Sequence, residues 1–191
     1  MKVTEMVDGK LIFITGKRGS GKTTWIKSYL ARQARVLVWD WRGEYDLPVV
    51  TLRDLMLKLQ GEDFFKVRYS PNFKDDLIEQ FDALSFCLLN WRCSNNFTLV
   101  VDEAYLVCPG GTHEGSLGRL IRLTRPKSID LIVSSQRPTL IPGVFRSEAD
   151  EWIVFSLHNP PDLYLVETMF GSACREVVQN LTQFQYICLE Y

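Results

Sequence analysis

Long hydrophobic runs are the feature that this sequence most clearly lacks. None of its apolar stretches approaches the roughly 18 consecutive residues that a membrane-spanning helix requires. The segment from Met1 to Gly9 also lacks the hydrophobic core of a signal peptide. We therefore expect a soluble, intracellular protein without an intrinsic membrane segment.

Metal-site and disulfide patterns are missing as well. The sequence has two histidines and five cysteines, and no two cysteines show the C-x-x-C spacing of a zinc site. The odd cysteine count argues against a complete disulfide framework, so we expect buried free thiols. The cysteines are Cys87, Cys93, Cys108, Cys174 and Cys188.

Neither sign of charge is in excess, because 22 lysines and arginines face 23 aspartates and glutamates. A protein that is basic over its whole surface is excluded, so nucleic acid would have to meet a local basic patch. The chain also has no linker rich in serine, glycine or proline. Its 191 residues are enough for one complete core, and we expect a single domain over residues 1–191.

Apolar, β-branched runs alternate with stretches of helical periodicity. The five clearest runs are Leu11 to Thr15, Arg35 to Trp39, Phe97 to Val101, Leu131 to Ser135 and Trp152 to Phe155. Helices are expected over 75–93 and 117–123, a short helix and strand over 52–59 and 66–69, and an edge strand over 186–191. This pattern predicts an α/β, doubly wound fold, in which helices cover both faces of a mostly parallel sheet.

The pattern G-x-x-x-x-G-K-[ST], typical of a phosphate-binding loop, spans Gly16 to Thr23. An incidental glycine-rich turn would match it too, but here an apolar run precedes the pattern and a helix-forming run, 25–32, follows it. Backbone N–H groups of such a loop surround a polyphosphate. The expected cofactors are ATP and Mg²⁺, with Lys22 reaching the β- and γ-phosphates and Thr23 binding the metal. The expected nucleotide contacts are Gly16, Lys17, Arg18, Gly19, Ser20, Gly21, Lys22, Thr23 and Thr24.

Polar side chains follow two of the later apolar runs. Asp102 is placed to hold Mg²⁺ together with Thr23, and Glu103 to act as general base toward the attacking water. An isolated Asp-Glu pair can equally be a solvated turn, and the phosphate loop upstream favours the catalytic interpretation. Gln136, after 131–135, is placed to contact the γ-phosphate and that water. A glutamate beside the metal-binding aspartate favours hydrolysis over transfer to an acceptor hydroxyl.

Three arginines, Arg119, Arg122 and Arg125, recur at a spacing of three residues, and Lys127 extends the run. They are open to three interpretations. The arginines can form a solvated helix face, contact nucleic-acid phosphates, or supply an arginine finger to the site of a neighbouring subunit. The third interpretation requires a ring of subunits.

Four motifs, taken together, resemble those of the FtsK–HerA superfamily of ring-forming DNA translocases. They are G-K-R-G-S-G-K-T-T, D-W-R-G-E-Y (Asp40 to Tyr45), V-V-D-E-A and I-V-S-S-Q-R-P (Ile132 to Pro138). The second and fourth are the specific ones, and the resemblance covers about residues 10–157. It implies a RecA-like (ASCE) P-loop NTPase fold, a single three-layer domain with a mostly parallel central sheet. Glu44 and Tyr45 are then expected to line the nucleotide site.

The resemblance also implies roles for individual residues. Lys22, Glu103 and Gln136 are expected to be catalytic, with Mg²⁺ held by Thr23 and Asp102. The superfamily's trans-acting arginine lies a few residues before the strand that ends in the sensor glutamine. Arg125 matches that position best, and Arg122 is second.

Within the superfamily, the chain looks like the minimal genome-packaging ATPases of tailless icosahedral viruses with an internal membrane. The resemblance implies an ATP-driven translocase that packages double-stranded DNA into a preformed capsid, as a homo-oligomeric ring of five or six subunits. Capsid or inner-membrane proteins at a packaging vertex are the other expected partners. The expected location is the host cytoplasm, with association to the virion.

Three alternative functions can be compared with the sequence features that each would require. An assembly ATPase of filamentous phages would act on single-stranded DNA and carry a membrane helix, which this chain lacks. Glu103 and Gln136 disfavour a small P-loop kinase or nucleotide hydrolase unrelated to DNA, and an intact Lys22 and Asp102 disfavour a non-catalytic switch. DNA contacts are expected from residues 109–118 or from 137–146, since ring motors grip DNA with loops.

Overall fold

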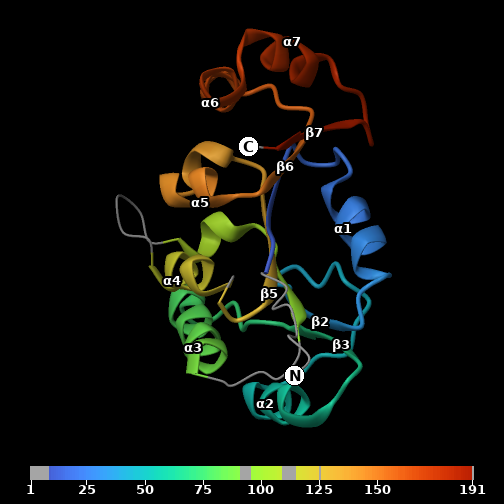
Figure 1. Ribbon diagram of the computed structural model, residues 1–191, viewed down its shortest axis with the longest axis vertical. Coiled ribbons are helices and arrows are strands. Elements are labelled where there is room, and N and C mark those ends of the chain that lie inside the picture. The colour runs from blue at the N-terminus through green and yellow to red at the C-terminus, as the bar shows by residue number, and fades with distance from the viewer. Residues whose placement is uncertain (1–8, 91–95, 109–114, 125, 191) are drawn as a thin grey trace, which may run out of the picture.

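The computed structural model describes residues 9–90, 96–108, 115–124 and 126–190 (Figure 1). Within these ranges the chain folds around one seven-stranded sheet in the order β3-β2-β4-β5-β1-β6-β7. Neighbouring strands are parallel, except for the antiparallel pair β6 and β7. The strands are β1 (Leu11–Thr15), β2 (Arg35–Trp39), β3 (Phe65–Tyr69), β4 (Phe97–Val101), β5 (Ile129–Ser135), β6 (Glu151–Phe155) and β7 (Tyr186–Glu190).

The central strands are buried along their whole length, which explains their continuous apolar sequences. Every residue of β1, β2 and β4 is buried, because layers on both sides exclude water from a parallel sheet. The bounds of these three strands agree with those expected from the sequence. The strands β5 and β6 begin slightly earlier than expected, at Ile129 and Glu151.

Helices lie on both faces of the sheet. In Figure 1, α1 lies on one face and α3, α4 and α5 lie on the other. Alternate side chains of β1 divide between the two cores, because Ile12 and Ile14 pack with Ile26 of α1 while Leu11 and Phe13 join the opposite cluster. The expected three-layer α/β fold is thereby confirmed. The helices are α1 (Lys22–Leu30), α2 (Leu52–Gly61), α3 (Leu77–Asn90), α4 (Gly115–Thr124), α5 (Gly143–Glu148), α6 (Pro160–Phe170), α7 (Ser172–Asn180) and the 3-10 helices η1 (Ala104–Val107) and η2 (Pro138–Leu140).

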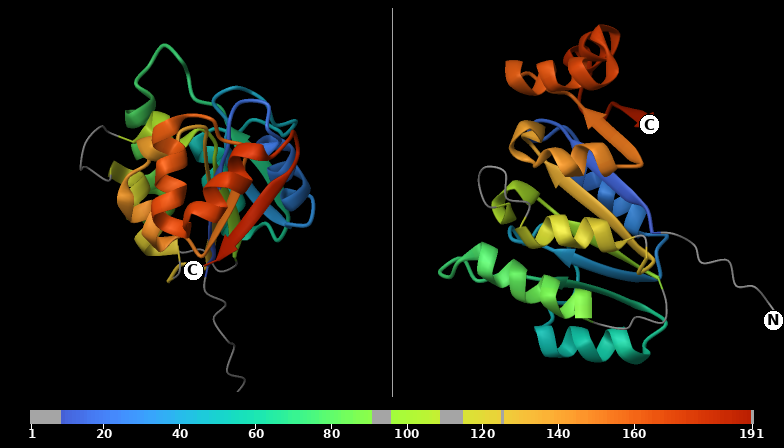
Figure 2. Two further views of the ribbon diagram at one scale, coloured as in Figure 1. Left: turned by 90° about the horizontal axis from the view of Figure 1, so that it is seen from above. Right: turned by 60° about the vertical axis from the view of Figure 1, so that its left-hand side comes forward.

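A helical hairpin, α6 and α7, lies beyond the β6–β7 end of the sheet (Figure 2). Gly171, with φ of 92°, makes the turn between the two helices. The fully buried Asp162 of α6 accepts hydrogen bonds from Thr139 (2.6 Å) and Asn159 (2.7 Å) and pairs with Arg137 (3.0 Å). This carboxylate therefore ties the segment that follows β5 to the hairpin.

The cysteines differ in part from expectation. Cys87, Cys108 and Cys174 are free and half-buried, whereas Cys188 is free and exposed. The expected burial was therefore wrong for all four, and Cys188 is exposed because β7 is an edge strand on which partly covered and exposed residues alternate. Cys93 lies outside the described residues.

Among the helices in the described ranges, none is both long and apolar enough to cross a bilayer.

Candidate active site

The phosphate loop joins β1 to α1 at the carboxyl edge of the sheet. The Ser20 N–H donates to the carbonyl of Lys17 (3.2 Å), and the Lys17 N–H donates to the carbonyl of Ser156 (2.8 Å). Gly21 has φ of 118°, and a Cβ there would lie 2.9 Å from Cδ1 of Phe184. The loop therefore needs glycine at this position for its conformation and for space.

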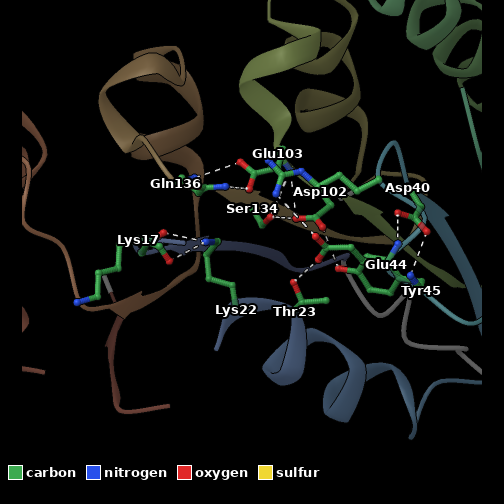
Figure 3. A network of polar contacts seen from close by, with 12 residues as sticks. Lys17, Lys22, Thr23, Asp40, Glu44, Tyr45, Asp102, Glu103, Ser134 and Gln136 are labelled. Carbon is green, nitrogen blue, oxygen red and sulfur yellow. Dashed lines mark hydrogen bonds and ion pairs between the residues drawn. The ribbon is translucent and has the colours of Figure 1, made fainter. Parts of the chain in front are cut away.

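Lys22 begins α1 and folds back over the loop (Figure 3). Its Nζ donates to the carbonyl oxygens of Gly16 (2.8 Å) and Lys17 (3.3 Å). Burial lowers the pKa of Lys22, while the carboxylates of Glu103 and Asp102 oppose that shift. An ammonium group that is poorly solvated and rests on two carbonyls can exchange them for phosphate oxygens, which are stronger acceptors.

Asp102 directly follows β4 at the same edge and is buried. The hydroxyl of Ser134 donates to its Oδ1, and the hydroxyl of Tyr45 donates to its Oδ2 (3.4 Å). Burial raises the pKa of Asp102, and the hydrogen bond from Ser134 opposes the shift. A carboxylate and a nearby hydroxyl, that of Thr23, are the hard oxygen ligands that Mg²⁺ prefers, so this donor set fits the expected metal.

Glu103 has an unusual backbone conformation and a fixed side chain. Its φ and ψ are 51° and 50°, in the left-handed region that residues other than glycine rarely adopt. Its carboxylate accepts a hydrogen bond from the side-chain amide of Gln136 and another from the Gln136 N–H (3.4 Å). Strained backbone at a buried carboxylate is typical of functional sites. Glu103 follows β4 and Gln136 follows the adjacent strand β5. Because hydrogen bonds join the two residues, movement of one would displace the other.

The D-W-R-G-E-Y segment forms a turn after β2 that carries Glu44 toward α1. The buried carboxylate of Asp40 accepts hydrogen bonds from the N–H groups of Glu44 (3.0 Å) and Tyr45 (3.1 Å) and pairs with Arg68 (3.2 Å). At the end of the turn, the Thr23 hydroxyl donates to Oε2 of Glu44 (3.1 Å). The motif therefore places a third carboxylate beside the hydroxyl expected to bind metal.

The ion pair of Arg68 with Asp40 gives a stability prediction. Arg68→Ala leaves the buried Asp40 carboxylate without its cation, and we expect the free energy of unfolding to fall by about 2 kcal/mol. The Arg68 side chain is 21% exposed, so water screens the pair and the loss is smaller than for a fully buried pair. Urea denaturation measures the change, with the exposed Arg53→Ala as control. Equal stability of the two variants would contradict this role for Arg68.

A cavity of about 350 Å³ lies between the loop, the acidic strand end and the C-terminal segment. Glu103 and Gln136 line it together with much of the phosphate loop, whereas Asp102 and Tyr45 lie outside its lining. The lining residues are Arg18, Gly19, Gly21, Lys22, Thr23, Thr24, Arg42, Glu44, Glu103, Gln136, Gln183 and Phe184.

Three of these lining residues, Arg42, Gln183 and Phe184, were not expected from the sequence. The Gln183 amide donates to the carbonyl of Gly19 (3.2 Å), and the Phe184 N–H donates to the carbonyl of Ser20 (2.8 Å). The C-terminal segment thus forms one wall of the cavity. No local pattern could have indicated contacts between residues this far apart in the sequence.

Several expected site residues lie elsewhere. Gly16 and Ser20 belong to the loop without lining the cavity, and the Lys17 side chain points away to His158, with Nζ 2.6 Å from Nε2. Arg122 is exposed on α4 and does not line the cavity. Arg125 lies outside the described residues.

Solved structures share this arrangement of strands and helices. The genome-packaging NTPase B204 of Sulfolobus turreted icosahedral virus 2, in complex with AMPPCP, is similar with a TM-score of 0.77 and 21% sequence identity. The similarity covers 95% of this chain and 92% of that one. This chain has the fold of a viral genome-packaging NTPase. The P-loop NTPase fold expected from the four motifs is therefore confirmed.

Two further structures are similar over most of their length. VirB4 of Thermoanaerobacter pseudethanolicus has a TM-score of 0.63 at 13% identity, covering 94% of this chain and 88% of that one. The N-terminal domain of zonular occludens toxin from Neisseria meningitidis has a TM-score of 0.52 at 18% identity, covering 80% and 79%. No protein-family model and no curated protein sequence matches the chain.

Proposed function

We propose that this chain is a Mg²⁺-dependent ATPase. The observation that carries the proposal is the convergence of Lys22, Thr23, Glu103 and Gln136 on one cavity, with Asp102 beside them. The fold supports it, because B204 was crystallised with AMPPCP, AMP and ATP-γS. Thr23 and Asp102 would hold Mg²⁺, which neutralises phosphate charge when bound.

The protein's own residues have distinct parts in the proposed reaction. Lys22 exchanges its carbonyl partners for oxygens of the β- and γ-phosphates. Glu103 accepts a proton from water while the water oxygen bonds to the γ-phosphorus and the bond to the ADP oxygen breaks. Gln136, hydrogen-bonded to Glu103, positions that carboxylate and senses the γ-phosphate. Its contact with Glu103 also makes the catalytic geometry dependent on the end of β5.

We further propose that hydrolysis drives double-stranded DNA into a preformed viral capsid. The motor would be a homo-oligomeric ring of five or six subunits, in the host cytoplasm and docked on capsid or inner-membrane proteins of the virion. The fold shared with B204 over nearly the whole chain supports this role. Arg137 and Thr139, just after Gln136, contact Asp162 of α6, so a shift of Gln136 would reach the hairpin.

Contacts to DNA are proposed for two segments. Residues 109–118 are one candidate, of which 109–114 lie outside the described residues and 115–118 begin α4. Residues 137–146 are the other, and they contain η2 and part of α5. Arg137 pairs with Asp162 and remains 47% exposed, so its guanidinium can also meet a phosphate.

An ATPase assay with duplex DNA, with single-stranded DNA and without DNA tests the proposal. We expect duplex DNA to stimulate hydrolysis, more strongly at low than at moderate salt, because phosphate contacts weaken as salt rises. Stimulation by single strands alone would favour a filamentous-phage type of assembly ATPase. Indifference to both kinds of DNA would favour a small P-loop kinase or nucleotide hydrolase.

The proposed ring also requires a trans-acting arginine, for which Arg125 is the first candidate and Arg122 the second. Arg125→Ala should bind ATP and hydrolyse it poorly, because its active site lacks the neighbour's cation. Mixing it with Lys22→Ala protein should restore activity, since each inactive Lys22→Ala subunit supplies an arginine to an intact site next to it. Activity is measured across mixing ratios, with Arg122→Ala in parallel. No rescue at any ratio, for either arginine, would contradict the trans role.

A further inference from the structure

A second cavity, of about 400 Å³, lies beside the phosphate cavity and is walled mainly by aromatic side chains. Thr24 and Phe184 line both cavities, so the two adjoin. Thr24 is also the last of the expected phosphate contacts. The cavity therefore begins where the phosphate-binding surface ends. Its lining residues are Thr24, Trp25, Ser28, Tyr29, Arg32, Phe155, Phe184 and Tyr186.

Three elements build this aromatic cavity. Thr24 and Ser28 lie one helical turn apart on α1, and Arg32 lies in the turn after that helix. Trp25 stacks on Tyr29 with ring centroids 5.5 Å apart. Phe155 ends β6, and Tyr186 begins β7 with its ring 5.3 Å from that of Phe155. The Trp25 and Tyr186 rings meet edge to face at 6.4 Å. The contacting rings thus come from α1, β6 and β7.

The aromatic wall is tied rigidly to the phosphate loop. Phe184 has φ of 66°, a strained value for a residue with a side chain, and its N–H donates to the carbonyl of Ser20 (2.8 Å). Phe184 and Tyr186 are nevertheless 58% and 46% exposed. Two large aromatic side chains held in water beside a cavity would gain from a flat apolar ligand that covers them.

We propose that this aromatic cavity holds the base of the nucleoside triphosphate and accepts adenine and guanine with little discrimination. The inference rests on the nucleotide binding of the proposed function. Stacking on aromatic rings tolerates any base and favours the larger purine surface. The polar side-chain groups of the lining residues are the hydroxyls of Thr24, Ser28, Tyr29 and Tyr186, the guanidinium of Arg32 and the indole N–H of Trp25. A hydroxyl rotates to donate or accept, so it can pair with the edge of either purine.

Calorimetric titration with ATP, GTP, CTP, UTP and tripolyphosphate, in Mg²⁺ and without DNA, tests the inference. We expect dissociation constants for ATP and GTP within about tenfold of each other. CTP and UTP should bind more weakly than either, and tripolyphosphate at least ~10-fold more weakly than ATP. A larger gap between ATP and GTP, or tripolyphosphate binding as tightly as ATP, would overturn it.

Variants of Tyr186 distinguish the loss of base stacking on its ring from a general loss of folded protein. Tyr186→Ala should weaken ATP binding by about tenfold and leave tripolyphosphate binding unchanged, whereas Tyr186→Phe keeps the ring and should bind ATP nearly normally. The control is Tyr164→Ala, since Tyr164 is 66% exposed on α6 and lines neither cavity. Unchanged ATP affinity in Tyr186→Ala would overturn the base site alone. Failure of every ligand, including tripolyphosphate, to bind wild-type protein would overturn both the base site and the proposed ATPase.

Discussion

Replacing Glu103 with glutamine is expected to lower kcat by at least ~100-fold while ATP still binds, because the variant loses the general base and little else. Glutamine has the shape of glutamate, and its amide oxygen can still accept the hydrogen bond from the Gln136 amide. The left-handed backbone at position 103 stays equally strained in both proteins. A loss of turnover therefore reports on the carboxylate itself.

Single-turnover hydrolysis and equilibrium ATP binding should be measured on the same Glu103→Gln preparation. Glu79→Gln, on the exposed side of α3, is the matched control and should hydrolyse ATP at the wild-type rate. If Glu103→Gln hydrolyses ATP normally, the assignment of Glu103 as general base is wrong.

Lys22→Ala is expected to weaken ATP binding by about 100-fold, the scale of losing charge-assisted hydrogen bonds in a poorly solvated site. The substitution should not lower Tm. Burial lowers the pKa of Lys22, so folding favours the neutral amine, and the protonated side chain costs stability at neutral pH. That cost is full below the lowered pKa, shrinks as pH rises above it and is gone above the ordinary value of 10.5, whereas alanine removes it at any pH.

The Lys22 prediction pairs a binding measurement with a thermal scan in the absence of nucleotide. Lys74→Ala, an exposed lysine before α3, serves as control and should change neither quantity. Wild-type ATP affinity in Lys22→Ala would refute the phosphate contact, and a marked drop in Tm would mean that Lys22 supports the fold.

Much of the fold was predictable because the central strands are buried on both faces. Burial of β1, β2 and β4 favours nearly continuous apolar runs, which are visible without a structure. The peripheral β3 lies at a sheet edge and is only partly buried. Its sequence has Lys66 and Arg68 among apolar residues, so it lacks the long apolar run that identifies the central strands. The expected strand nevertheless began only one residue late, at Lys66, and ended correctly at Tyr69.

The central part of the site was predictable for a related reason. The strands β4, β5 and β1 are neighbours and parallel, so residues after them meet at one edge, as Asp102, Gln136 and Lys22 do. By contrast, Arg42 depends on a turn anchored by the pair of Asp40 with Arg68. Phe184 reaches the loop through a contact that only the tertiary fold creates. No spacing rule indicates either of them.

Triplex displacement measures the proposed movement along duplex DNA most directly. A short third strand is bound to a long duplex, and its release is followed with ATP, with AMPPCP and with the Glu103→Gln protein. We expect release by the wild-type protein with ATP only, because translocation requires repeated hydrolysis. Robust ATP hydrolysis by the wild-type protein on that duplex, without release of the third strand, would contradict translocation along DNA.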